Sequence, residues 1–134
     1  MKILNQYTKE VLTENNGRNM RDTVILAVIQ KVSLEDADLQ GADYLCNVDL
    51  RNVNLYNANL QDIDFSNTDL RGADLRSTNL QNANLQGADL RGADLRSAHL
   101  WDANLVNANL EGAKLYGADV RGTILCDDTY LTID

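Results

Sequence analysis

Residues 88–97 read ADLRGADLRS, two copies of one five-residue unit placed end to end. The same unit can be followed from about residue 32 to residue 125. Each copy has a large apolar residue at its centre, a small or β-branched residue two positions earlier, and a polar residue between them. An internal repeat decides the architecture before any single motif does. The central residues fall at Leu34, Leu39, Tyr44, Leu50, Leu55, Leu60, Phe65, Leu70, Leu75, Leu80, Leu85, Leu90, Leu95, Leu100, Leu105, Leu110, Leu115, Val120 and Leu125.

A period of five matches neither the 3.6 of a helix nor the 2 of a plain strand. The unit instead predicts a short extended side followed by a corner: the small residue points inward, the polar residue outward and the central residue inward. The corner ends mostly in Gly or Asn, which accept the positive φ that the third position of a type II turn requires. Four units close one coil, and stacked coils pair about 4.8 Å apart. The sequence therefore predicts an all-β solenoid with a leucine core.

The repeat has one irregularity. An extra residue lies between the centres Tyr44 and Leu50, and we assign it to residues 45–47. We expect it to bulge one corner of an early coil.

The Ala-(Asp/Asn)-Leu-X-X unit closely resembles the motif of the pentapeptide-repeat family, and it covers most of the chain. The resemblance implies a right-handed quadrilateral β-helix of about five coils. The loop-free run of repeats is also similar to bacterial members found in cyanobacteria. The same resemblance implies a less favoured function, because some members imitate duplex DNA and bind type II topoisomerases such as DNA gyrase.

The two ends of the repeat need covers, because a solenoid end exposes apolar interior and unpaired strand edges. Ile3, Leu4, Tyr7, Val11 and Leu12 fall on one helical face, so we expect an α-helix over residues 2–15. The predicted organisation is a helical cap at 1–26, the β-helix at 27–126 with residues 27–29 as its first unit, and a tail at 127–134. An end-to-end dimer through the C-terminal coil is the alternative cover.

Charge and composition limit the kinds of partner that the protein can bind. The net charge is −8, of which residues 32–125 carry −7. An acidic surface argues against direct nucleic-acid binding, which needs Lys and Arg to displace counterions. We expect no membrane span and no secretory signal, and therefore a cytoplasmic protein. Cys46 and Cys126 fit a reducing compartment, since they stand four coils apart, about 19 Å at the strand spacing.

Residues 20 apart stack in outward columns, which places an Asp/Arg lattice on two neighbouring sides. The lattice either neutralises itself or presents a patterned charge to a partner. The other two sides are richer in Asn and poorer in cations, and we expect them to carry most of the negative potential. The lattice residues are Asp69, Arg71, Asp74, Arg76, Asp89, Arg91, Asp94 and Arg96.

His99, Trp101 and Val106 break the polar outward pattern and form a candidate interaction patch. Exposed apolar patches mark contacts, and Trp is enriched at binding hot spots. A tolerated set of surface residues is the plainer interpretation.

Catalysis has little support. The chain has one histidine, so it offers no paired-His metal site and no triad, and its glycines recur singly at corners rather than in a phosphate loop. We expect no enzyme activity, no metal and no cofactor. The favoured function is a structural or protein-interaction module with an unidentified protein partner; the alternative is an acidic DNA mimic that modulates gyrase.

Overall fold

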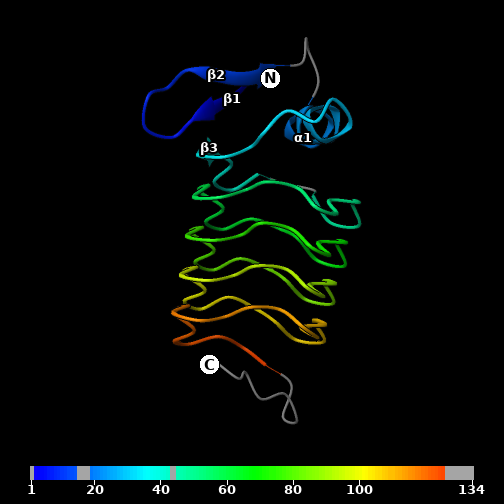
Figure 1. Ribbon diagram of the computed structural model, residues 1–134, viewed down its shortest axis with the longest axis vertical. Helices are drawn as coiled ribbons and strands as arrows, with labels where there is room; N and C mark the ends of the chain where they lie inside the picture. The colour runs from blue at the N-terminus through cyan, green and yellow to red at the C-terminus, as the bar shows by residue number, and fades with distance from the viewer. Residues whose placement is uncertain (1, 15–18, 43–44, 126–134) are drawn as a thin grey trace.

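The computed structural model describes residues 2–14, 19–42 and 45–125. Strands β1 (Lys2–Asn5) and β2 (Val11–Glu14), helix α1 (Met20–Ile29) and strand β3 (Ala37–Asp38) come first. The rest of the described chain winds into coils stacked along one axis, with the β1–β2 hairpin and α1 at the N-terminal end (Figure 1). The chain is a β-solenoid, as the repeat predicts.

Parallel bridges between equivalent residues of successive coils stack the solenoid. They run from Asp38↔Asn59 to Asn104↔Ile124, always at the outward position before the central residue. Each contact is a pair of backbone bonds: Leu75 N–H donates to Asp94 C=O at 2.8 Å, and Asp94 N–H donates back to Ala73 C=O at 2.9 Å. The outward columns expected from the sequence are therefore confirmed.

The corners also follow the prediction. In the corners from Asn52 onward, a residue with positive φ is followed by a residue whose N–H bonds back three positions, as in Ala58 N–H to Leu55 C=O at 3.0 Å around Asn57, whose φ is 55°. Gly87, with φ of 68°, shows why glycine is placed at some corners: a Cβ there would lie 2.4 Å from the Asn67 side-chain oxygen one coil earlier. Stacked corners thus limit side-chain size as well as φ.

The core is a column of leucines beside a column of small residues. Leu70, Leu75, Leu90 and Leu95 are fully buried, and so are the small residues that precede them by two positions. Each buried leucine contributes about 1.5–3 kcal/mol, which lets the core form with Phe65 as its one buried aromatic ring among the described residues.

The helix expected over residues 2–15 is wrong. Those of them that the structure describes form the β1–β2 hairpin, and β1 pairs antiparallel with β3 of the first coil, Leu4 opposite Asp38. Ile3 is buried, while Tyr7 and Val11, assigned to the same helical face, are exposed. The hairpin is preferred because the first coil offers a strand edge, which a helix would leave unpaired.

The N-terminal helix begins later, at Met20. Asn19 caps it by accepting from Asp22 N–H at 2.8 Å, and Val24 and Ala27 pack into the solenoid core. Residues 27–29 therefore end α1 and are not the first repeat unit.

The irregularity lies one step earlier than residues 45–47. Leu45 is fully buried and Asn47 has the corner φ of 59°, so the regular phase has resumed by Leu45. In the regular coils an N–H donates to the carbonyl 19 residues later, as in Leu75 to Asp94, and Asn47 N–H to Ser66 C=O already has this span. Leu39 N–H to Asn59 C=O spans 20 residues, so the extra residue lies within that earlier span. Leu45 is thus an inward centre, which the sequence did not predict. Tyr44, Cys126 and the tail at 127–134 lie outside the described residues.

Candidate interaction surfaces

Four sides surround the core, and each presents its own set of outward residues. The first arginine side holds 49, 51, 69, 71, 89, 91, 109 and 111; the second arginine side holds 54, 56, 74, 76, 94, 96, 114 and 116. The amide side holds 59, 61, 79, 81, 99, 101, 119 and 121; the fourth side holds 64, 66, 84, 86, 104, 106 and 124.

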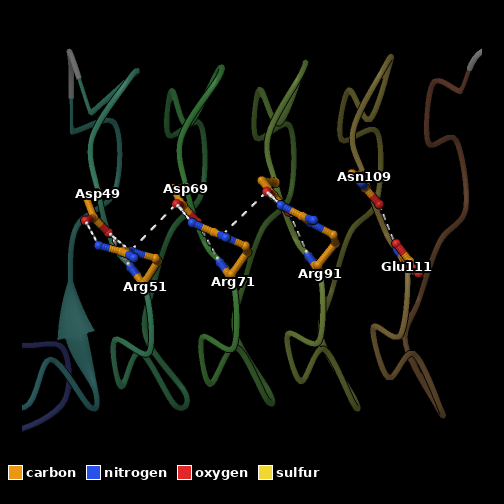
Figure 2. A network of polar contacts seen from close by, with 8 residues as sticks. Asp49, Arg51, Asp69, Arg71, Arg91, Asn109 and Glu111 are labelled. Carbon is orange, nitrogen blue, oxygen red and sulfur yellow. Dashed lines mark hydrogen bonds and ion pairs between the residues drawn. The ribbon is translucent and has the colours of Figure 1, made fainter.

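The first arginine side is a continuous chain of ion pairs (Figure 2). Arg71 grips Asp69 with two bonds, Nε to Oδ1 at 2.8 Å and Nη2 to Oδ2 at 2.6 Å. Its Nε also lies 3.6 Å from Asp89 Oδ2 in the next coil, and Arg51 reaches Asp69 Oδ2 in the same way at 3.7 Å. Arg51 and Arg71 thus each contact a carboxylate in their own coil and in the next.

These bonds shift the titration of the carboxylates. Hydrogen bonds from Arg51 hold the pKa of Asp49 at about 2, and Arg71 lowers the pKa of Asp69 by the same interaction. An exposed ion pair contributes little free energy. The consequence of the pairing is that the negative charge of each aspartate in the lattice is neutralised by a neighbouring arginine.

The chain of pairs stops at Arg91. The next coil places the amide Asn109 where an aspartate stood, and Asn109 Oδ1 instead accepts the Glu111 N–H at 3.0 Å (Figure 2). The second arginine side repeats the design with Arg76 on Asp74 and Arg96 on Asp94, both at 2.6 Å, and Arg76 lies 5.2 Å from the centre of the Tyr56 ring. All eight predicted lattice residues therefore form ion pairs, each arginine binding the aspartate two positions before it through two hydrogen bonds. The four pairs are Asp69–Arg71, Asp74–Arg76, Asp89–Arg91 and Asp94–Arg96.

The candidate patch is divided by a corner. His99 and Trp101 lie on the amide side and Val106 on the fourth side, with the corner at Asp102 between them. The Trp101 side chain is 47% exposed, and the Arg121 guanidinium lies 5.8 Å from the centre of its ring. Asp119 holds Arg121 in place with Nε–Oδ1 and Nη2–Oδ2 bonds of 2.8 and 2.6 Å.

Two neighbours of the patch were missed from the sequence. Arg121 stacks on Trp101, and Ile124, 54% exposed, follows Asn104 in the column beside Val106. Both could have been found by extending the columns through one more coil.

A groove of about 700 Å³ lies at the opposite end, between α1 and the first arginine side. Ile25, Val28 and Val48 supply apolar lining, and Ile29, 72% exposed, stands at the groove as well. Arg21, also in the lining, is anchored by Nη1 to the Cys46 carbonyl at 2.8 Å. No sequence pattern indicated this groove, because it arises where α1 lies against the coils.

Over the described ranges, no cluster of three His, Cys, Asp or Glu side chains is arranged to hold a metal ion. In the same ranges, no helix is long and apolar enough to cross a bilayer.

The family model for pentapeptide repeats matches this sequence in 8 copies, over residues 30–72, 58–96 and 88–127. The chain belongs to the pentapeptide-repeat family. No curated protein matches it.

Solved structures of the family resemble the chain. HetL, a pentapeptide repeat protein involved in heterocyst differentiation regulation from the cyanobacterium Nostoc sp. strain PCC 7120, is 33% identical with a TM-score of 0.56. The match covers 66% of this chain and 44% of HetL, so the chain spans less than half of that relative. AT2G44920 of the Arabidopsis thaliana thylakoid lumen is 29% identical, with a TM-score of 0.58 and coverage of 72% and 70%.

A third similar structure is QnrB1, a plasmid-mediated fluoroquinolone resistance protein. It is 22% identical over 64% of this chain and 58% of its own, with a TM-score of 0.37.

Proposed function

We propose that this chain, a right-handed quadrilateral solenoid of about five coils, is a cytoplasmic, non-catalytic protein-binding module. Its docking surface is the patch of His99, Trp101 and Val106, extended by Arg121 and Ile124. The observation that carries the proposal is the half-exposed Trp101 indole with Arg121 stacked on it. Trp and Arg are the side chains most enriched at the centres of protein interfaces.

The C-terminal end of the described solenoid supports the same location. Leu110, Val120 and Leu125 are only partly buried, in contrast to the centres of earlier coils. Within the described residues the N–H groups of Leu110 and Leu115 donate to no carbonyl, whereas Leu90 and Leu95 donate to Asn109 and Lys114. A partner docking beside Trp101 would meet these N–H groups, and a second copy joined end to end is one such partner.

The test compares two exposed apolar residues at opposite ends of the rod. Tagged wild-type protein, Trp101→Ala and Ile29→Ser are used to capture partners from a lysate, with each captured protein identified and its affinity remeasured with purified components. We expect Trp101→Ala to weaken binding by about tenfold or more, the loss of a hot-spot residue. Binding that survives Trp101→Ala but is lost in Ile29→Ser would move the docking surface to the α1 groove.

The DNA-mimic function has less support. A mimic of duplex DNA needs unpaired negative charge along the rod, and on the two arginine sides Asp49, Asp69 and Asp89, together with Asp74 and Asp94, are each bound by an arginine. A gyrase supercoiling assay, with and without a quinolone, tests it directly. Inhibition or protection at low micromolar protein that disappears at raised salt would favour the mimic over the patch.

A further inference from the structure

A polar groove of about 500 Å³ lies on the amide side, where the loop between β1 and β2 overhangs the coils. Gln6 N–H donates to the Asp36 carbonyl at 2.8 Å, and its side chain donates to the Asn57 carbonyl. Asn57 Nδ2 in turn lies 3.3 Å from the Tyr7 hydroxyl. The loop is thus held over the solenoid, and the groove has walls from two separate parts of the chain.

The groove carries no fixed charge, although the chain as a whole has a net charge of −8. Its lining includes Tyr7, Ser77, Asn79, Gln81, Ser97 and His99. A phosphorylated or carboxylated ligand would need cations here, and a metal would need carboxylates. The lining therefore favours a neutral ligand that bonds through hydroxyl groups.

Several of these polar groups have no protein partner. Within the described residues, the side chains of Ser77, Ser97, Gln81 and His99 make no hydrogen bond. The hydroxyl and amide groups among them can both donate and accept, and a neutral imidazole offers one of each. They present an array of unfilled donors and acceptors to solvent.

The array follows the coil spacing. Ser97 lies one coil below Ser77, and His99 one coil below Asn79, so equivalent polar groups recur about every 4.8 Å along the axis. Tyr7, 66% exposed, adds an aromatic surface at one end, on which an apolar C–H face can pack. The volume falls in the range of about 300–1,000 Å³ typical of small-molecule sites.

We propose that this groove binds a neutral oligosaccharide whose pyranose rings lie along the solenoid axis. Sugar hydroxyls both donate and accept, which matches the lining, and the C–H face of one ring packs on Tyr7. The inference concerns a different surface from the Trp101 patch, apart from His99 at their shared border, and it does not depend on protein binding there.

The probes are cellohexaose, laminarihexaose, maltohexaose and mannohexaose at millimolar concentration, with tri-galacturonate as the anionic comparison. Each is titrated into ¹⁵N-labelled protein. We expect at least one neutral hexaose to shift the backbone amides of residues 77–81 and 97–99. Failure of all four neutral probes, tighter binding of the anionic one, or shifts confined to other sides would overturn the proposal.

Variants make the test specific. Gln81→Ala and His99→Ala should each weaken binding by about tenfold, the effect of one lost hydrogen bond. Gln86→Ala is the matched control, since Gln86 occupies the same position of the repeat on the fourth side and is not in the groove lining. If Gln86→Ala weakens oligosaccharide binding equally, the effect is not specific to the groove and the proposal is overturned.

Discussion

The first arginine side and the middle coils of the amide side share one backbone and one spacing, yet the charged side chains of the first pair with one another while Gln81 and His99 of the second make no side-chain hydrogen bond within the described residues. In both, the outward residue before the central leucine accepts a backbone bond two positions later: Asp69 from Arg71 at 3.2 Å, Asn79 from Gln81 at 3.2 Å. The Arg71 side chain also donates two hydrogen bonds to the Asp69 carboxylate, whereas the Gln81 side chain makes no hydrogen bond in the described part of the chain. Side-chain chemistry at two outward positions decides whether a solenoid side is available to a ligand.

The largest effect should come from breaking the core on which both sides depend. Leu90 is fully buried between the columns of alanine and leucine. Leu90→Lys would bury an unpaired charge at a cost of several kcal/mol, comparable to the whole stability of a small domain. We expect unfolding or aggregation, measured by circular dichroism and size-exclusion chromatography. Arg91→Gln, which changes the exposed neighbour, should remain folded; a folded, monomeric Leu90→Lys would contradict the inward register.

A smaller effect should follow from opening the ion-pair chain. Asp69 binds Arg71 and lies near Arg51, and its pKa is below the ordinary value of 3.8. Asp69→Asn should lower the free energy of unfolding by about 0.5–1 kcal/mol at pH 7. A carboxyl whose pKa is lowered by folding stabilises fully above its ordinary pKa and loses that contribution as the pH falls through the lowered value. The difference from wild type should therefore vanish in acid.

Urea unfolding at pH 7 and near pH 2 measures this difference. Asp64→Asn is the control, because Asp64 on the fourth side accepts from Asn84 Nδ2 and Ser66 N–H, and an amide oxygen can accept the same bonds. Its stability at pH 7 should be nearly unchanged. If Asp69→Asn lowers the free energy of unfolding as much near pH 2 as at pH 7, the stabilisation by Asp69 comes from packing and not from its charge.

The smallest effect should come from the amide side. Ser77→Ala combined with Gln81→Ala removes polar groups that bond to nothing in the described chain, so the free energy of unfolding should change by less than about 0.5 kcal/mol. Thermal unfolding checks this, with Gln86→Ala as the matched control for Gln81→Ala, because Gln86 follows its central leucine in the same way on the fourth side. A loss of stability as large as that of a core substitution would show that these groups support the fold, and the proposed difference between the two sides would be wrong.

The sequence predicted the solenoid well because its determinants are local. Leu90 faces inward and Asp89 outward for reasons contained within one pentad, and repetition then places Asp69, Asp89 and Asn109 in one column. The arginine forks were foreseeable on the same ground, since Asp and Arg stand two positions apart at a fixed corner. His99, Trp101 and Val106 were found as departures from the repeat.

The N-terminal part was not predictable in this way. Ile3, Leu4, Tyr7, Val11 and Leu12 fit a helical face, but they also fit two short strands with a polar turn between them. The choice depended on β3, far along the chain, whose free edge pairs with β1. Leu45 was misassigned for a related reason: only the inter-coil bonds show where the extra residue is absorbed.

The sequence by itself determined the five-residue period, the leucine core, the columns of outward residues and the excess of negative charge, because each depends on residues within one or a few repeats. The tertiary structure decided what covers the N-terminal end, where α1 leaves a groove, and that Tyr7 lines one groove together with Ser77 and His99 of the coils. These depend on contacts between segments far apart in the chain. Such contacts are selected by the hydrogen bonds and apolar area that the finished coils leave unfilled, which no local pattern records.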